Sequence, residues 1–180
     1  MRPIYLQVGL LSAVLATTGT ASAQTATFSG FDDNTGSARC YDPATTAPDP
    51  TNPNRLVIGM APCVASSPTG AKTAMDTLNF QVAAPDGYYV SRITFTQSGS
   101  TSGSRGGSGF RGATWVVDKT PLAVPATGGG WAATVDLSLH RKTVFPVAIT
   151  TYLAAFGIQV VSGSATASNP VVLVELAPLQ

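Results

Sequence analysis

Short segments in which apolar and polar residues alternate dominate this sequence. Leu78, Phe80 and Val82 alternate with polar residues within Thr77–Val82. The same period of two recurs in the segments Tyr88–Thr96, Trp131–Leu139 and Val144–Ala154. This period is the pattern of a β-strand with one buried face, and no segment shows the sustained 3.6-residue period of a helix. Strands of this kind must cover one another, so the pattern predicts an all-β fold.

Turn residues separate the alternating segments. Pro85-Asp86-Gly87 suits a reversal, because proline presets φ and glycine tolerates positive φ. We therefore expect Thr77–Val82 and Tyr88–Thr96 to form a hairpin. Shorter apolar runs predict further strands at 26–31, 55–60, 111–119, 157–161 and 171–176. Eight or nine strands predict a single antiparallel β-sandwich, either a jelly roll or immunoglobulin-like.

Three polar segments are predicted to be loops. Asp32–Asn54 is a long stretch rich in Pro, Thr, Asp and Asn. Ser98–Gly109 is a low-complexity Gly/Ser run, and Ser162–Pro170 is rich in small residues. The strands are thus expected to be joined by extended surface connections.

The first 23 residues have the pattern of a cleavable secretory signal peptide. Arg2 precedes the apolar run Val8–Ala16, and Ala21-Ser22-Ala23 offers small residues for cleavage before Gln24. Residues 24–180 are then expected to form one domain, secreted to the periplasm or the extracellular space.

The charge content limits the partners that we expect. Charged residues make up 11% of the chain, and without Arg2 nine basic residues oppose nine acidic ones. A chain without net charge has no electrostatic attraction to nucleic acid. No later apolar run is long enough to span a bilayer. We therefore expect neither nucleic-acid binding nor a membrane span in the mature chain.

The two cysteines are predicted to form a disulfide. Cys40 and Cys63 are the only cysteines in the chain, and an even pair in an exported protein indicates a bridge. A redox or zinc pair is the alternative, but zinc sites need further ligands.

The reactive side chains do not form a recognisable catalytic motif. His140 is the only histidine, and its neighbours Arg141 and Lys142 indicate an exposed turn. A catalytic triad would have to use it with Ser138 and Asp136, and no oxyanion element is evident beside them. We therefore predict that the chain is not an enzyme.

Calcium is the metal ion that the sequence favours most. Asp32, Asp33 and Asn34 are consecutive oxygen-bearing residues before a glycine, and calcium prefers such ligands. They lack the spacing of an EF-hand, and Asx residues before glycine also form simple turns. The three residues are candidate calcium ligands.

Aromatic residues are the candidate ligand-binding side chains. Tyr88, Tyr89 and Trp115 could present flat rings to a sugar. Trp131 lies on the apolar face of its segment and is expected in the core, whereas the pattern around Trp115 fits either location.

The stretch from Leu78 to Asp118 includes FQVAAPDGYYVSRITFTQSGS and ATWVVD, and FSGFDDN lies near the predicted mature start. In these segments the chain resembles secreted β-sandwich exoproteins of Gram-negative bacteria of the PEP-CTERM class. The resemblance implies a cell-surface or matrix role. The chain departs from that class because it ends in ELAPLQ, without the Pro-Glu-Pro sorting signal. No site residue is carried over.

These observations favour an exported structural protein of the cell surface, the matrix or a filament, which associates with itself or with a cell-surface glycan. A carbohydrate-binding module, with or without calcium, is the alternative. A hydrolase with an unidentified pair of carboxylates is a third hypothesis, for which Glu175 is the only glutamate available.

Overall fold

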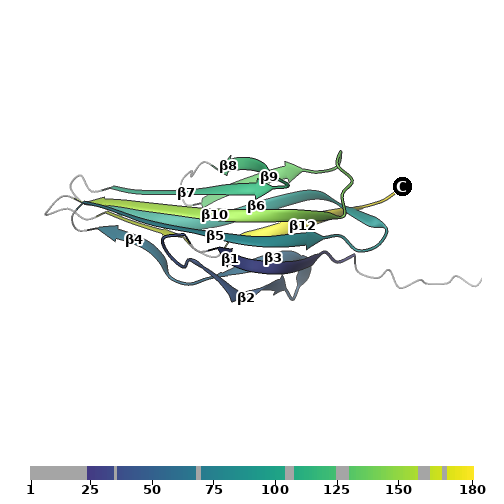
Figure 1. Ribbon diagram of the computed structural model, residues 1–180, viewed down its shortest axis with the longest axis horizontal. Helices are drawn as coiled ribbons and strands as arrows, with labels where there is room; N and C mark the ends of the chain where they lie inside the picture. The colour runs from purple at the N-terminus through teal and green to yellow at the C-terminus, as the bar shows by residue number, and fades with distance from the viewer. Residues whose placement is uncertain are drawn as a thin grey trace, which may run out of the picture.

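The computed structural model describes residues 24–34, 36–67, 70–103, 108–124, 130–157, 163–167 and 170–180. Its described residues form twelve strands and no helix. The strands make two antiparallel sheets that pack face to face in a long, narrow sandwich (Figure 1). The predicted β-sandwich is confirmed, but twelve strands replace the eight or nine expected.

One sheet has five strands. Its order is β1 (Thr27–Asn34), β5 (Gly70–Ala83), β10 (Val144–Gly157), β7 (Ser108–Val117) and β8 (Thr120–Val124). The two 14-residue strands β5 and β10 pair along their whole length, from Ala83 opposite Val144 to Gly70 opposite Gly157. This long pair sets the length of the sandwich.

The other sheet has seven strands. Its order is β2 (Tyr41–Asp49), β3 (Asn52–Met60), β12 (Val171–Pro178), β6 (Tyr88–Gly103), β11 (Gly163–Ala167) and β4 (Cys63–Ser67), and β9 (Gly130–Asp136) also pairs with β6. The long strand β6 pairs with β12 along its first part and with β11 along its last part. The sheet is therefore wide at one end of β6 and narrower at the other.

The alternation identified the buried faces of β5 and β6 correctly, but the predicted hairpin is wrong. Leu78 and Phe80 of β5 and Phe95 of β6 are buried. However, β5 pairs with β1 and β10, whereas β6 pairs with β9, β11 and β12. The turn at 84–87 reverses the chain, and Gly87 has the positive φ of 80° that was expected there. The chain crosses to the facing sheet at this turn, and the apolar faces of the two strands pack together.

Much of the predicted loop 32–54 is strand. It contains the end of β1, all of β2 and the first residues of β3. Pro43 and Pro48 are compatible with β2 because this strand lies at the sheet edge and needs hydrogen-bond donors on one side only.

The other two predicted loops also contain strand residues. Within Ser98–Gly109, β6 continues to Gly103 and β7 begins at Ser108, and β11 lies within Ser162–Pro170. Small Ser, Thr and Gly residues there pair across strands, which composition alone did not indicate.

The segment Trp131–Leu139 is shorter as a strand than predicted. Strand β9 ends at Asp136, and Leu139 is 97% exposed in the following turn. Leu137 is buried, whereas the side chain of Trp131 lies outside the described residues.

Two clusters fill the space between the sheets. The main core is built from large apolar side chains, among them Phe95, Trp115 and Phe145. The second cluster, here called the disulfide core, is smaller and consists of Cys40, Cys63, Ala65, Ala74, Leu153, Ala155 and Ala165. The predicted Cys40–Cys63 disulfide is confirmed, with Cα atoms 4.7 Å apart.

The predicted signal peptide, Met1–Ala23, lies outside the described residues. In the part of the chain that is described, no helix is long and apolar enough to cross a bilayer. The disulfide is compatible with an oxidising compartment.

Candidate functional site

Trp115 lies in the main core rather than on a surface. Its side chain is fully buried and packs against Phe95, with 5.8 Å between the ring centroids. Strand β7 directs Ala113, Trp115 and Val117 inward together. Trp115 therefore cannot present its ring to a sugar in this conformation, and its assignment as a candidate ligand-binding residue is corrected.

Tyr88 and Tyr89 lie at the start of β6 and are partly buried. The Tyr88 hydroxyl accepts a hydrogen bond from Gln24 Nε2 at 2.6 Å. The two tyrosines pair with Pro178 and Ala177 of β12. They do not form a common aromatic surface with Trp115, which is enclosed between the sheets.

The candidate calcium ligands lie in strand β1 rather than in a loop. Asp32 is exposed on the outer face, whereas Asp33 is partly buried and interacts with Asp76. Consecutive strand residues point to opposite faces, so these two carboxylates diverge. The side chain of Asn34 is outside the described part, within which no group of three His, Cys, Asp or Glu residues is arranged to hold a metal ion.

His140 is exposed in the turn at 138–140, as predicted. Its backbone N–H donates to the Leu137 carbonyl at 2.9 Å. Nearby, hydrogen bonds from Ser138 hold the pKa of Asp136 below its usual value. The contacts of Asp136 thus fasten the turn.

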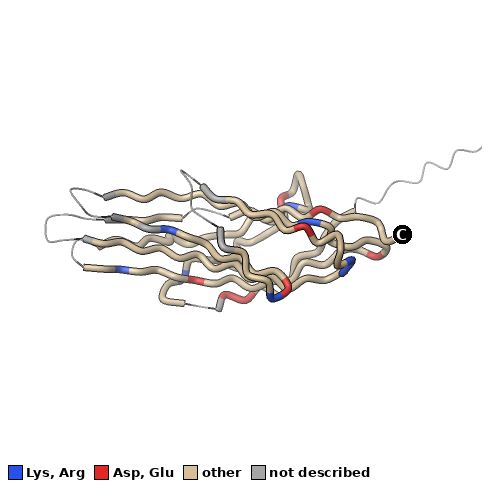
Figure 2. The backbone as a smooth tube through the Cα atoms, turned by 90° about the horizontal axis from the view of Figure 1, so that it is seen from above, with Lys and Arg blue, Asp and Glu red and all other residues tan. Residues whose placement is uncertain are grey.

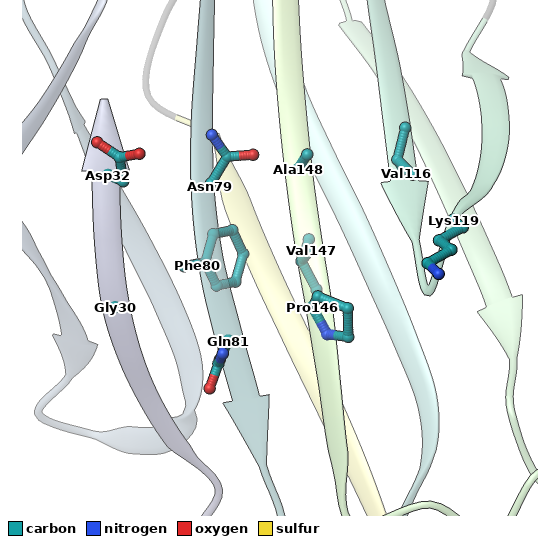
Figure 3. Close-up of a pocket in the computed structure, with 10 residues that line it drawn as sticks. All are labelled: Gly30, Asp32, Asn79, Phe80, Gln81, Val116, Lys119, Pro146, Val147 and Ala148. Atoms are coloured by element: carbon teal, nitrogen blue, oxygen red, sulfur yellow. The ribbon is translucent and has the colours of Figure 1, made fainter. Parts of the chain in front are cut away.

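A shallow groove of about 450 Å³ crosses the outer face of the five-stranded sheet (Figure 3). Asp32 of β1 and Lys119 of the β7–β8 turn place opposite charges at its two ends. The side chains of Asn79 and Gln81 project from β5 between them. Pro146 and Ala148 of β10 and Val116 of β7 supply an apolar floor. The groove thus combines the side-chain amides of Asn79 and Gln81 with an apolar floor, and it carries one negative and one positive charge.

A row of threonines continues the same face beside the groove. Thr77, Thr150 and Thr114 are neighbours on β5, β10 and β7, and Thr77 Oγ1 lies 2.8 Å from Thr150 Oγ1. The outer face of the other sheet repeats this motif, because Thr94 Oγ1 lies 3.1 Å from Thr134 Oγ1. Hydroxyl groups on these faces therefore form the hydrogen bonds that charged side chains form on the surface of most proteins.

Charged side chains are distributed unevenly along the sandwich. The end of the molecule away from the C-terminus carries few of them on its described strands (Figure 2). There, hydroxyls again pair across strands, with Ser100 Oγ 2.7 Å from Thr166 Oγ1.

A layer of buried polar side chains separates the two cores, and sequence reasoning missed it. We call it the polar layer; it consists of Tyr41, Asp76, Gln97, Arg111 and Thr151. Along β5 the inward residues run from Ala74 to Asp76 to Leu78, and along β10 they run from Ile149 to Thr151 to Leu153. Each polar residue stands at a position where the alternation along its strand places the side chain inward. The alternating pattern therefore predicts that these side chains are buried.

Hydrogen bonds within the polar layer join the two sheets. The Tyr41 hydroxyl of β2 lies 2.6 Å from Thr151 Oγ1 of β10, and burial raises the pKa of Tyr41. Thr151 Oγ1 in turn lies 3.2 Å from Gln97 Oε1 of β6. The Arg111 guanidinium of β7 donates to the backbone carbonyl of Gly99 on β6. These contacts hold the two facing sheets in position relative to each other.

The sequence matches no model of a known protein family, and a comparison with curated proteins finds no significant relative.

Proposed function

We propose that the chain is an exported, non-enzymatic structural protein of the cell surface, the extracellular matrix or a filament. The observation that carries this proposal is the polar layer. Tyr41, Gln97 and Thr151 come from three strands in two sheets, and their hydrogen bonds hold the sheets together. An interior that is cross-linked in this way suits a structural unit.

Two further features support a role outside the cytoplasm. The Cys40–Cys63 bridge needs an oxidising environment to persist. The outer sheet faces present paired hydroxyls such as Thr94 with Thr134. Residues 1–23 are proposed to direct export and to be removed before Gln24.

Localisation and self-association test this proposal. The full chain is expressed in a Gram-negative host, cell-surface and matrix fractions are collected, and the N-terminus of the recovered protein is sequenced. The expected product begins at Gln24, is retained on cells or matrix, and associates at high concentration in sedimentation experiments. A product that stays monomeric and leaves no trace on cells or matrix contradicts the proposal.

The groove favours carbohydrate binding as a second candidate function. It extends from β1 to β7, which is roughly 14 Å at the usual spacing of strands. The planar amides of Asn79 and Gln81 can hydrogen-bond sugar hydroxyls, and Pro146 and Ala148 form a flat floor for an extended oligosaccharide.

A glycan array, with and without calcium, tests this second function. Any hit is expected to weaken in Asn79→Ala and Gln81→Ala variants. Thr94→Ala is the matched control, because Thr94 lies on the outer face of the opposite sheet. An array without hits in either condition removes this candidate.

A further inference from the structure

Asp76 is a fully buried carboxylate at the boundary between the two cores. Its Oδ2 accepts hydrogen bonds from the backbone N–H groups of Cys40 at 2.5 Å and Tyr41 at 2.9 Å, and its Oδ1 accepts one from Thr77 at 2.9 Å. Asp76 thereby fixes the segment that leads from β1 into β2.

Asp33 approaches Asp76 from the neighbouring strand. In the β1–β5 ladder Asp33 is opposite Leu78, so Asp76 is its diagonal neighbour on the inward face. Asp76 acts on Asp33 both as a side-chain hydrogen-bond partner and as a like charge, and both effects raise the pKa of Asp33. Both Asp76 oxygens already accept N–H groups, so a proton on Asp33 provides the donor that this bond requires.

We propose that Asp33 and Asp76 form a proton-dependent latch that fastens β1 and residues 36–41 to the five-stranded sheet. This proposal is independent of the proposed function. When Asp33 loses its proton, the bond becomes a contact between two carboxylates. Asp33 Oδ1 is buried and has no hydrogen-bond partner within the described residues, so no hydrogen bond to this oxygen offsets the added charge.

The surroundings of Asp33 set the direction of the pH dependence. Burial, the hydrogen bond to Asp76, the charge of Asp76 and, last, the charge of Asp32 raise the pKa of Asp33 above 3.8, and only Arg39 opposes them. Tyr41 of β2 binds Asp76 through its backbone, and its hydroxyl is bonded to Thr151. The folded state therefore holds the proton more tightly than the unfolded state. The contribution of the latch to stability is therefore fully present below pH 3.8 and is lost as pH rises through the folded-state pKa of Asp33.

The attached segment has other contacts that would loosen together with the latch. The backbone N–H of Ala38 donates to the Met75 carbonyl at 3.2 Å, and Met75 N–H donates to Ser37 Oγ at 3.0 Å. Gly36 lies so close to Met75 that a Cβ would be 2.3 Å from the carbonyl oxygen. Release of the latch would therefore expose the backbone of β5 along this edge.

Hydrogen exchange of the intact, oxidised chain between pH 4 and pH 8 tests the latch, after correction for intrinsic exchange rates. Protection of residues 27–34 and 36–41 is expected to fall with rising pH. The fall is about tenfold for each pH unit between the ordinary pKa of an aspartate and the raised pKa of Asp33. An Asp33→Asn variant supplies a permanent N–H donor, so its protection is expected to stay constant. Its unfolding midpoint at pH 7 is expected to exceed that of the wild type by a few degrees.

Asp32→Asn is the matched control, because it removes the same charge from the adjacent, outward-facing residue. It is expected to keep a fall in protection with rising pH, because the charge of Asp32 is the smallest of the causes that raise the pKa of Asp33. The proposal is overturned if wild-type protection is flat over this range, or if Asp33→Asn shows the same fall. Should Asp33→Asn not fold, carbon NMR titration of the wild type decides, and an Asp33 carboxyl that titrates at or below 3.8 overturns the latch.

Discussion

The main core and the disulfide core belong to the same sandwich but are stabilised by different means. The main core buries large side chains such as Phe95, Trp115 and Phe145. The disulfide core buries four alanines, Leu153 and the Cys40–Cys63 bridge. Alanine removes little apolar surface from water, so the hydrophobic effect stabilises this region far less. The comparison indicates that a covalent bridge and hydrogen bonds stabilise the contact between the sheets where the buried side chains are too small to do so.

Phe95→Ala is expected to have the largest effect on this comparison. It removes a fully buried ring that packs on Trp115, so unfolding should become easier by about 3–5 kcal/mol. Chemical denaturation measures the change. An effect below about 1 kcal/mol would contradict the view that burial stabilises the main core.

Removal of the disulfide is expected to have the next largest effect. The double variant Cys40→Ala and Cys63→Ala frees a loop with a sequence separation of 23 residues. Chain entropy predicts a loss of roughly 3–4 kcal/mol. The denaturation midpoint under oxidising conditions checks this, and the wild type in reductant should approach the variant. If the variant is as stable as the wild type, the bridge is not what holds the disulfide core.

A smaller effect is expected from the polar layer. Thr151→Val keeps the shape of the side chain but removes the hydroxyl that contacts Tyr41 and Gln97. Two buried polar groups lose a partner, so we expect a destabilisation of roughly 1–3 kcal/mol. Thr150→Val, on the outer face beside it, is the control and should change stability by about 0.5 kcal/mol or less. Equal effects of the two substitutions would contradict a special role for the layer.

The smallest expected effect concerns the β2–β3 turn on the surface. Hydrogen bonds from Thr51, followed by Arg55, lower the pKa of Asp49 to about 2. This contribution is present above 3.8 and is lost as pH falls toward 2. Thr51→Ala should therefore flatten the acid side of the stability profile between about pH 4 and pH 2. An unchanged acid slope would show that the turn does not contribute.

Strand faces could be read from the sequence, whereas strand partners could not. The period of two correctly placed Leu78, Phe80 and Phe95 inside. The turn at Pro85-Asp86-Gly87 is compatible both with a hairpin and with a crossing to the facing sheet. The pattern of neither flanking strand distinguishes these outcomes, because both require an apolar face.

The candidate site was less predictable because its members are distant in sequence. The groove combines residues of β1, β5, β10 and β7, and the latch joins Asp33 to Asp76. Only strand order and register bring such residues together. The alternation places Gln97 and Thr151 at inward-facing positions of their strands. However, a polar residue at such a position is more readily interpreted as the end of the strand than as a buried side chain.

Residue-resolved hydrogen exchange with and without reductant tests the division between the two cores most directly. Reduction is expected to lower the protection of amides in β4 and β11, which pair beside Cys63. Amides in β12 and the first part of β6, over the main core, should keep most of their protection. A uniform loss across both regions, or no loss in β4 and β11, would contradict the account.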